Sequence, residues 1–426
     1  MEKHIGEKLK ITENGIKIFS YPNPFLHSFQ ISLYVRSGSI HETVDNCGIS
    51  HFFEHIAIRN VNRIRDGQLY SELDRLGVEF NASTYSELVQ FYVGGSPSSF
   101  SFAAGVLLDV LKPIVLSAKE VDEERARIKA EMRESDERTS LSAFTSDIVH
   151  SGTSLSRSIT GTVGSINRIT KTKLEEFRKS TLVPENIFFY VTGNVRDEDI
   201  TEICSLLEGV PLDRGECKPN IAPVSRNFFK RETKVYIKNA EFTMPRFTFD
   251  LDMSKITLAE ADLIYDVLLS GYNSEFFIEL SEKRGLFYDV SGALERYLNI
   301  GTLSFSFELR SSELYEALDV TVGILKKMKT DLLPEERCMR AAYVDNAYML
   351  LDDAREMNFT FAYDNHVMEA GYSCIDDRIA AYSRVTPECI REICREIFRP
   401  ENLTLTMKGK KNKIDTDRII GIISNL

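Results

Sequence analysis

The stretch His51-Phe52-Phe53-Glu54-His55 organises the rest of this sequence. As one turn of α-helix, its i, i+4 spacing puts the two imidazoles on one face, about 6 Å apart along the axis at ~1.5 Å rise per residue. Two ring nitrogens can then converge on one ion, and Glu54, on the neighbouring strip, can take a proton from a metal-bound water. Three fixed positions also fit an ordinary helical turn with two hydrogen-bonded histidines. The surrounding sequence has to distinguish that turn from a metal site.

Length and composition narrow the class of protein. A chain of 426 residues suggests two or three domains, and 43% hydrophobic with 27% charged residues is typical of a globular protein. The formal charge of −12 disfavours nonspecific binding to nucleic acid or anionic membranes and favours a basic peptide. The most apolar stretch, residues 101–117, is interrupted by Asp109 and Lys112, so we expect a buried helix and no membrane span.

The amino terminus and the cysteines indicate the compartment. Residues 1–8 contain no apolar h-region, so no signal peptide is expected. The seven cysteines are odd in number, irregularly spaced and include no C-x-x-C. We therefore expect reduced thiols in a cytoplasmic protein rather than a disulfide framework.

Strand and helix signals surround the motif. Asn14-Gly15 lies between two alternating apolar runs, which is a strong hairpin signal. We predict strands over residues 9–12, 16–19, 28–36, 78–84 and 88–93. We predict helices for the motif after Gly48, for 66–76 before Gly77, for 101–116 and for the charged segment 119–138.

A segment of the first half recurs in the second half. Its three parts reappear with a constant offset of 216 residues: Arg168-Ile169-Thr170 as Arg384-Val385-Thr386, Pro184-Glu185-Asn186 as Pro400-Glu401-Asn402, and Gly193 as Gly409. This repetition indicates duplicated domains. Proline, glycine and polar residues cluster over 208–232, as in an interdomain linker. We predict domains at 1–210 and 233–426 with a linker at 211–232.

The histidines are unevenly divided between these halves. Six of the seven lie in the first half and only His366 in the second, so we expect an inactive second domain that closes over a substrate held by the first. A catalytic zinc site takes three protein ligands and leaves a fourth position for water. The third ligand is expected in the charged helix, where Glu124 and Glu131 are seven residues apart on one face.

These motifs together resemble the pitrilysin and insulinase family of inverzincin zinc peptidases, particularly its small members related to mitochondrial processing peptidase. H-x-x-E-H inverts the zincin order and is followed, 76 residues after its second His, by Glu131 within E-R-x-x-x-x-x-E-M. Residues 48–55 are similar to the family's G-x-x-H-F-x-E-H, and residues 77–84 to its G-x-x-x-N-A-x-T strand. Residues 161–166 also fit, so the resemblance covers most of the chain.

The resemblance implies a fold and a way of binding substrate. The fold class is α+β: two similar α/β domains, each an antiparallel-rich sheet with helices on one face, forming a clam. Asn81, Ala82 and Ser83 would lie on an edge strand that pairs with the extended backbone of a peptide substrate.

The resemblance also implies the chemistry. Zn²⁺ would be bound by His51, His55 and Glu131, and Glu124 would orient a ligand histidine. Zinc lowers the pKa of its water from ~15.7 to about 7, and Glu54 as general base would pass that proton to the leaving amine.

One segment departs from the family pattern. Residues 276–288 resemble L-R-E-K-x-G-L-x-Y, which usually supplies an Arg and a Tyr seven residues apart to steady the substrate and the oxyanion. Tyr288 is present as the expected catalytic tyrosine, but Ser281 stands at the Arg position. Loss of a guanidinium there can reduce the rate by ~10²-fold or more. Since some family members divide the two sites between subunits, we expect a homologous partner subunit in a heterodimer, or a homodimer.

We predict a zinc metalloendopeptidase that cleaves small unfolded peptides. The sequence looks most similar to bacterial processing peptidases of peptide-bacteriocin gene clusters, which implies removal of a leader from a precursor peptide. The alternative is a noncatalytic partner subunit of a heterodimeric peptidase, against which the four intact chemical positions argue. A hydrolase of other substrates is disfavoured because the strand at 81–83 suits a peptide backbone.

Overall fold

The computed structural model describes residues 6–134, 140–287, 290–332 and 346–426, and the chain divides into two compact units. Unit 1 comprises Met1–Ser135, Arg157–Asn220 and Ala347–Asp377; unit 2 comprises Asp136–Ser156, Ile221–Asn346 and Arg378–Leu426. The change at residues 220 and 221 lies within the expected linker. Each unit, however, also contains one segment from the opposite half of the sequence.

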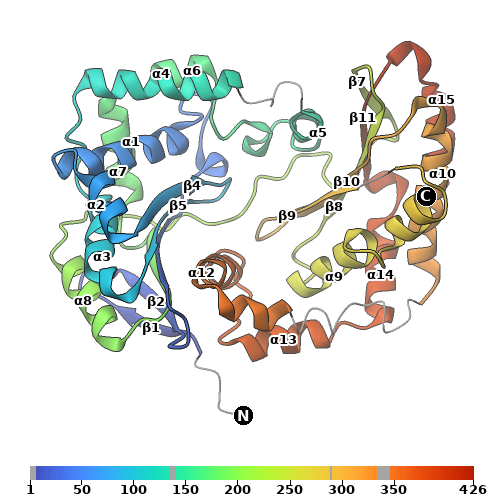
Figure 1. Cartoon of the computed structure of the whole chain (residues 1–426). Coiled ribbons are helices and arrows are strands. Elements are labelled where there is room, and N and C mark those ends of the chain that lie inside the picture. Colours follow the sequence, from blue (N-terminus) through green and yellow to red (C-terminus); the bar gives the residue numbers. More distant parts are fainter. Residues whose placement is uncertain (1–5, 135–139, 288–289, 333–345) are drawn as a thin grey trace. The chain divides into compact units, whose positions relative to one another are not determined.

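Unit 1 is built on a six-stranded sheet of order β1-β2-β6-β3-β5-β4 (Figure 1). Only β2 and β6 pair in parallel; the other neighbours are antiparallel. The hairpin expected at Asn14-Gly15 is confirmed by the β1–β2 pair. The strands are β1 (Lys8–Ile11), β2 (Lys17–Pro22), β3 (Phe29–Val35), β4 (Glu79–Thr84), β5 (Val89–Gly95) and β6 (Ile187–Gly193).

The apolar face of this sheet packs against helices of the first half. Phe29, Ile31 and Leu33 alternate along β3 and lie in the buried core. The expected apolar helix is shorter than 101–116 and ends at Asp109, before the turn that leads to Pro113. The helices are α1 (Ile49–Ile64), α2 (Leu69–Leu76), α3 (Phe100–Asp109), α4 (Ala118–Glu134), α6 (Val163–Arg168), α7 (Lys171–Thr181) and α8 (Asp197–Glu208).

The opposite face of the sheet carries both polar and aromatic side chains and is covered by a helix from the second half, α12 (Ala354–Ala362) (Figure 1). Asn358 of α12 is fully buried there. The Tyr34 hydroxyl donates to its Oδ1 at 3.0 Å, and its Nδ2 donates to the Tyr190 carbonyl at 2.8 Å. Unit 1 therefore has helices on both faces of its sheet, which corrects the expectation of helices on one face, because Asn358 and Phe361 give α12 both hydrogen-bonded and aromatic contacts with the second face.

Unit 2 repeats this plan with a five-stranded sheet of order β7-β11-β8-β10-β9. Its strands are β7 (Val235–Asn239), β8 (Met244–Leu251), β9 (Ser291–Arg296), β10 (Gly301–Ser306) and β11 (Leu403–Gly409). Its own helices include α9 (Leu258–Leu269), α10 (Leu314–Thr330), α14 (Pro387–Ile397) and α15 (Thr416–Ile423), while α13 (Ile375–Ser383) crosses the boundary between Asp377 and Arg378. The exchanged helix is α5 (Leu141–Val149), whose Thr145 hydroxyl lies 2.6 Å from that of Thr406 on β11.

The repeated sequence segments have the same structural roles in both units. Thr170 and Thr386 each cap the helix that follows, accepting a backbone N–H with the side chain. Asn186 and Asn402 each donate from Nδ2 to the end of that helix and to a neighbouring strand. The sequence offset of 216 residues thus corresponds to a repeated helix–strand unit.

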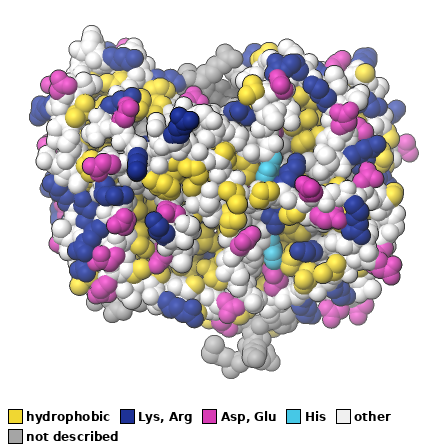
Figure 2. Space-filling view, turned by 180° about the vertical axis from the view of Figure 1, so that it is seen from behind, with side chains coloured by type: hydrophobic (Ala, Val, Ile, Leu, Met, Phe, Trp, Pro, Cys, Tyr) yellow, Lys and Arg dark blue, Asp and Glu magenta, His cyan; other side chains and the backbone are white. Residues whose placement is uncertain are grey.

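The length of the helices and the distribution of surface charge bear on the expectations drawn from the composition. Among the described residues, no helix combines the length and the apolar character that crossing a bilayer requires. On the face shown in Figure 2, acidic and basic side chains are interspersed rather than gathered into one field.

Candidate metal centre

The motif lies at the beginning of α1, whose start is fixed by close packing. Gly48 caps the helix in the left-handed region (φ 86°), and a Cβ there would lie 2.7 Å from the carbonyl oxygen of Thr160. The Glu42 carboxylate accepts the N–H groups of Gly48 and Ser50 at 2.7 and 3.0 Å. A carboxylate is favourable at a helix N-terminus, where N–H groups are free. These contacts set where the first turn of α1, and with it the motif, lies.

Two helices bring the predicted metal ligands together. His51 and His55 project from α1, and their ring centroids are 4.6 Å apart. Glu131 projects from α4, with its two carboxylate oxygens 3.5 Å from His51 Nε2 and 3.4 Å from His55 Nε2. Ligand atoms of His51, Glu54 and His55 all lie within 4.8 Å of one another. Two imidazoles and one carboxylate are a donor set that suits zinc.

Glu124 lies on the other side of His55. Its Oε1 is 2.9 Å from His55 Nδ1, and its side chain is almost completely buried. Burial raises the pKa of this carboxyl, but hydrogen bonds from His55 and Arg59 outweigh burial and leave the pKa below its ordinary value. An ionised carboxylate only accepts, so Nδ1 carries the proton and Nε2 of His55 is free to bind a metal.

His51 is held in the neutral form that metal binding needs. Burial, and secondly the neighbouring His55, lower the pKa of His51 to about 4. Its Nδ1 is buried without a hydrogen-bond partner in the described part of the chain. The two imidazoles and the Glu131 carboxylate are the kinds of donor that zinc takes, so the residues present fit a zinc ion.

Glu54 has a partner that the sequence argument did not identify. The Thr84 hydroxyl, at the end of β4, donates to Glu54 Oε2. In the sequence Thr84 belongs only to a strand motif, and no local pattern relates it to a residue thirty positions earlier. The contact orients one carboxylate oxygen of Glu54.

The predicted substrate strand is β4, which ends the sheet at one edge. Ala82 packs its methyl group into the core, whereas Asn81 is exposed. Asn81 Oδ1 accepts the Ala82 N–H at 2.9 Å, so a side chain occupies this backbone donor. Ser83 follows and is paired in register with Gln90 of β5.

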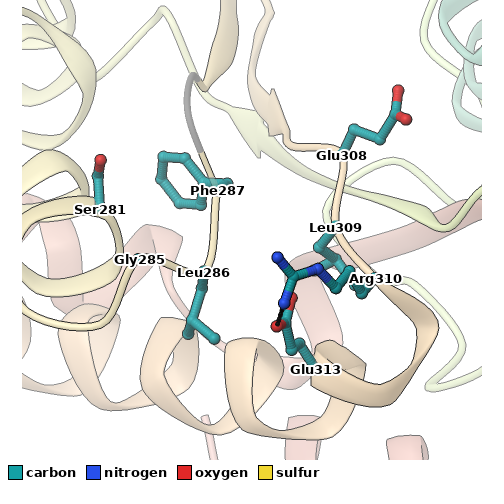
Figure 3. A pocket seen from close by; sticks show the side chains of 8 residues that line it. All are labelled: Ser281, Gly285, Leu286, Phe287, Glu308, Leu309, Arg310 and Glu313. Carbon is teal, nitrogen blue, oxygen red and sulfur yellow. Dashed lines mark hydrogen bonds and ion pairs between the residues drawn. The ribbon is translucent and has the colours of Figure 1, made fainter.

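The segment that departs from the family pattern lies in unit 2. Ser281 lines a cavity of about 560 Å³ together with Phe287 and Arg310, and Figure 3 shows Arg310 paired with Glu313. Arg284, three residues after Ser281, forms an ion pair with Glu279 at 2.9 Å. Tyr288 lies outside the described residues.

Comparison with known proteins identifies the family. The sequence profile described as Insulinase (Peptidase family M16) matches residues 17–163, and the profile described as Peptidase M16 inactive domain matches residues 168–342. The chain belongs to peptidase family M16. An uncharacterized zinc protease of Rickettsia felis is 25% identical to the M16 chain over 426 residues, covering 96% of each protein.

Solved structures show the same fold. A peptidase M16 inactive domain from Pseudomonas fluorescens has a TM-score of 0.83 at 14% identity, covering 95% of the M16 chain and 98% of that chain. The periplasmic protease PqqL from Escherichia coli has a TM-score of 0.81 at 16% identity, covering 99% of the M16 chain and 50% of PqqL. The predicted fold class of two similar α/β domains is confirmed.

Proposed function

We propose that this M16 chain is a zinc metalloendopeptidase whose site is the α1–α4 cluster. The observation that carries the proposal is the approach of Glu131 to within 3.5 Å of both imidazoles, with Glu54 beside them. His51, His55 and Glu131 would hold the ion, which, when bound, acts as a Lewis acid toward water and a scissile carbonyl. The relatives' name, zinc protease, supports the same metal.

The chain's own residues supply the proton transfers and the orientation. Glu54 takes the proton of the attacking water and returns it to the leaving amine. Thr84 holds one Glu54 oxygen, which leaves the other free for the proton. Glu124 keeps the His55 proton on Nδ1.

The experiment is a comparison of wild type with Glu54→Gln, measuring bound zinc by elemental analysis and hydrolysis by mass spectrometry of a mixed peptide library. We expect zinc in both proteins and a loss of activity of about 10²- to 10⁴-fold in the variant, because the general base is removed. Zinc-free wild type, or equal hydrolysis by both proteins, would contradict the proposal and favour a noncatalytic subunit.

The substrate is proposed to be a small unfolded peptide. An extended peptide can add to the edge of β4, using backbone hydrogen bonds that a folded protein does not offer. The narrower proposal is removal of a leader from a bacteriocin precursor, a role like that of the subtilosin maturation protein AlbF. It is supported by sequence resemblance alone, and incubation with precursor peptides followed by mass spectrometry tests it.

A homologous two-domain subunit is proposed as a partner, in a heterodimer or a homodimer. Ser281 stands at the position of the family arginine, and among the described residues Arg284 and Arg310 are paired with glutamates. The fold match to PqqL supports the idea, because this chain corresponds to half of that protein's length. Full activity of a monomer, with the monomer shown by sedimentation and the activity by peptide assay, would remove the need for a partner.

A cytoplasmic location is proposed from the cysteine pattern.

A further inference from the structure

The stripe of α1 that carries the two histidines continues with two arginines. Four residues follow one another at four-residue spacing along this stripe: His51, His55, Arg59 and Arg63. Their carboxylate partners on α4 come in reverse order: Glu131, Glu124 with Glu123, and Glu120. The two helices are therefore antiparallel along this contact. Imidazole–carboxylate pairs come first along α1, and guanidinium–carboxylate pairs follow.

The Glu124 carboxylate contacts both a histidine and an arginine of α1. Glu124 Oε1 lies 2.9 Å from His55 Nδ1, while its Oε2 accepts from Arg59 Nη1 at 3.2 Å. Arg59 also binds Glu123 with its other terminal nitrogen. Both oxygens of the buried Glu124 carboxylate are thus held, one by the imidazole and one by the guanidinium.

Resting on the zinc site proposed above, we propose that Arg59 is a positioning residue for metal binding. In the described part of the chain, Arg59 forms its ion pairs with Glu123 and Glu124 and none with the expected ligand Glu131. It fixes the rotation of the Glu124 carboxylate, which in turn fixes the ring of His55. Such outer partners typically change metal affinity by about 10- to 100-fold when they are removed.

The neighbouring Arg127 explains why this bond matters. Its Nη1 lies 3.8 Å from Glu124 Oε1, the same oxygen that faces His55, and its side chain is 76% exposed. Without Arg59, Arg127 would be the only arginine or lysine of the described residues paired with Glu124, and it would compete with His55 for this oxygen. Arg59 holds the carboxylate from the opposite side and preserves the His55 contact.

The test measures zinc affinity by competition with a chromophoric chelator, using the full chain. We expect Arg59→Ala to weaken zinc binding by about 10- to 100-fold and Arg59→Lys to weaken it less, since lysine keeps the charge but not the forked geometry. Arg63→Ala is the matched control: Arg63 lies on the same stripe, 4.0 Å from Glu120 and away from Glu124, and should change the affinity less than about twofold. Far-ultraviolet circular dichroism of the zinc-free proteins checks that all are folded.

A double substitution tests whether Arg59 affects zinc binding through Glu124. Because Arg59 acts through Glu124, Arg59→Ala should add less than about threefold once Glu124→Gln is present. Equal zinc affinity of Arg59→Ala and Arg63→Ala, or an undiminished effect in the Glu124→Gln background, would overturn the inference while leaving the proposed function standing. A wild type that binds no zinc would overturn both.

Discussion

His51 links the metal centre to the stability of the fold. Its pKa is lowered to about 4 from 6.5, chiefly by burial and then by His55. Between these values the unfolded chain binds a proton that the folded chain does not bind, so unfolding becomes easier as the pH falls. A residue proposed as a metal ligand is therefore also expected to make the metal-free protein sensitive to acid.

The metal-free protein is accordingly expected to lose up to about 3 kcal/mol of stability from His51 between pH 6.5 and 4, since one pKa unit corresponds to ~1.4 kcal/mol. Urea unfolding of chelator-treated protein at several pH values measures the loss, and His51→Gln should reduce the pH slope. His41, whose pKa burial also lowers to about 4, keeps its contribution in both proteins. Identical slopes for wild type and variant would contradict the expectation.

The spacing of residues in the sequence predicts this site only in part. His51 and His55 were expected together because i, i+4 spacing acts within one helix, and the seven-residue spacing of Glu124 and Glu131 places both on one face of the next. Arg59 could have been found by extending the same four-residue stripe. Thr84 could not, because its contact with Glu54 joins a strand to a helix.

At the scale of elements, the start of α1 depends on Gly48. Gly48 and Gly77 both have positive φ, at 86° and 61°, but only Gly48 has backbone atoms within 3 Å of a new Cβ; at Gly77 nothing lies within 4 Å. The two glycines therefore separate backbone strain from close packing.

Gly77→Ala is expected to destabilise the protein by about 1 to 2 kcal/mol through left-handed strain alone. Gly48→Ala should destabilise it more and also weaken zinc binding, because the clash displaces the first turn that carries His51. Urea unfolding and chelator competition on both variants make the comparison. Equal losses would show that packing at Gly48 does not set the position of α1.

The helix α12 is attached to its sheet by buried hydrogen bonds of Asn358 as well as by the stacking of Phe361 on Tyr21. Asn358→Leu should destabilise the protein by about 2 to 4 kcal/mol, because it leaves the buried Tyr34 hydroxyl and Tyr190 carbonyl without this partner. Glu356→Gln, an exposed change on the same helix, should stay within about 0.5 kcal/mol. Thermal or urea unfolding distinguishes them, and similar small effects would mean that α12 is held by other contacts.

For the whole molecule, duplication could be predicted but the exchange of segments could not. The repeat was visible because Thr170 and Thr386, with Asn186 and Asn402, keep the same local capping and strand-entry roles. The assignment of α5 and α12 to opposite units depends on which sheet face each helix packs against, and these faces are built from strands far away in the sequence. A cut at 211–232 therefore separates the halves of the sequence but not the compact units.

This exchange predicts how a nicked protein behaves. A protease site inserted after Glu216, within exposed residues 213–217, should allow cleavage into two fragments that stay associated, because the first fragment keeps α5 of unit 2 and the second keeps α12 of unit 1. Size-exclusion chromatography should show co-elution in native buffer and separation in urea, with the uncut insertion protein as control. Fragment 1–210 expressed alone should show weakened protection of its sheet in hydrogen exchange, because the polar face around Tyr34 has lost Asn358. Two folded fragments that elute separately without urea would show that each half is complete and that the exchanged helices are dispensable.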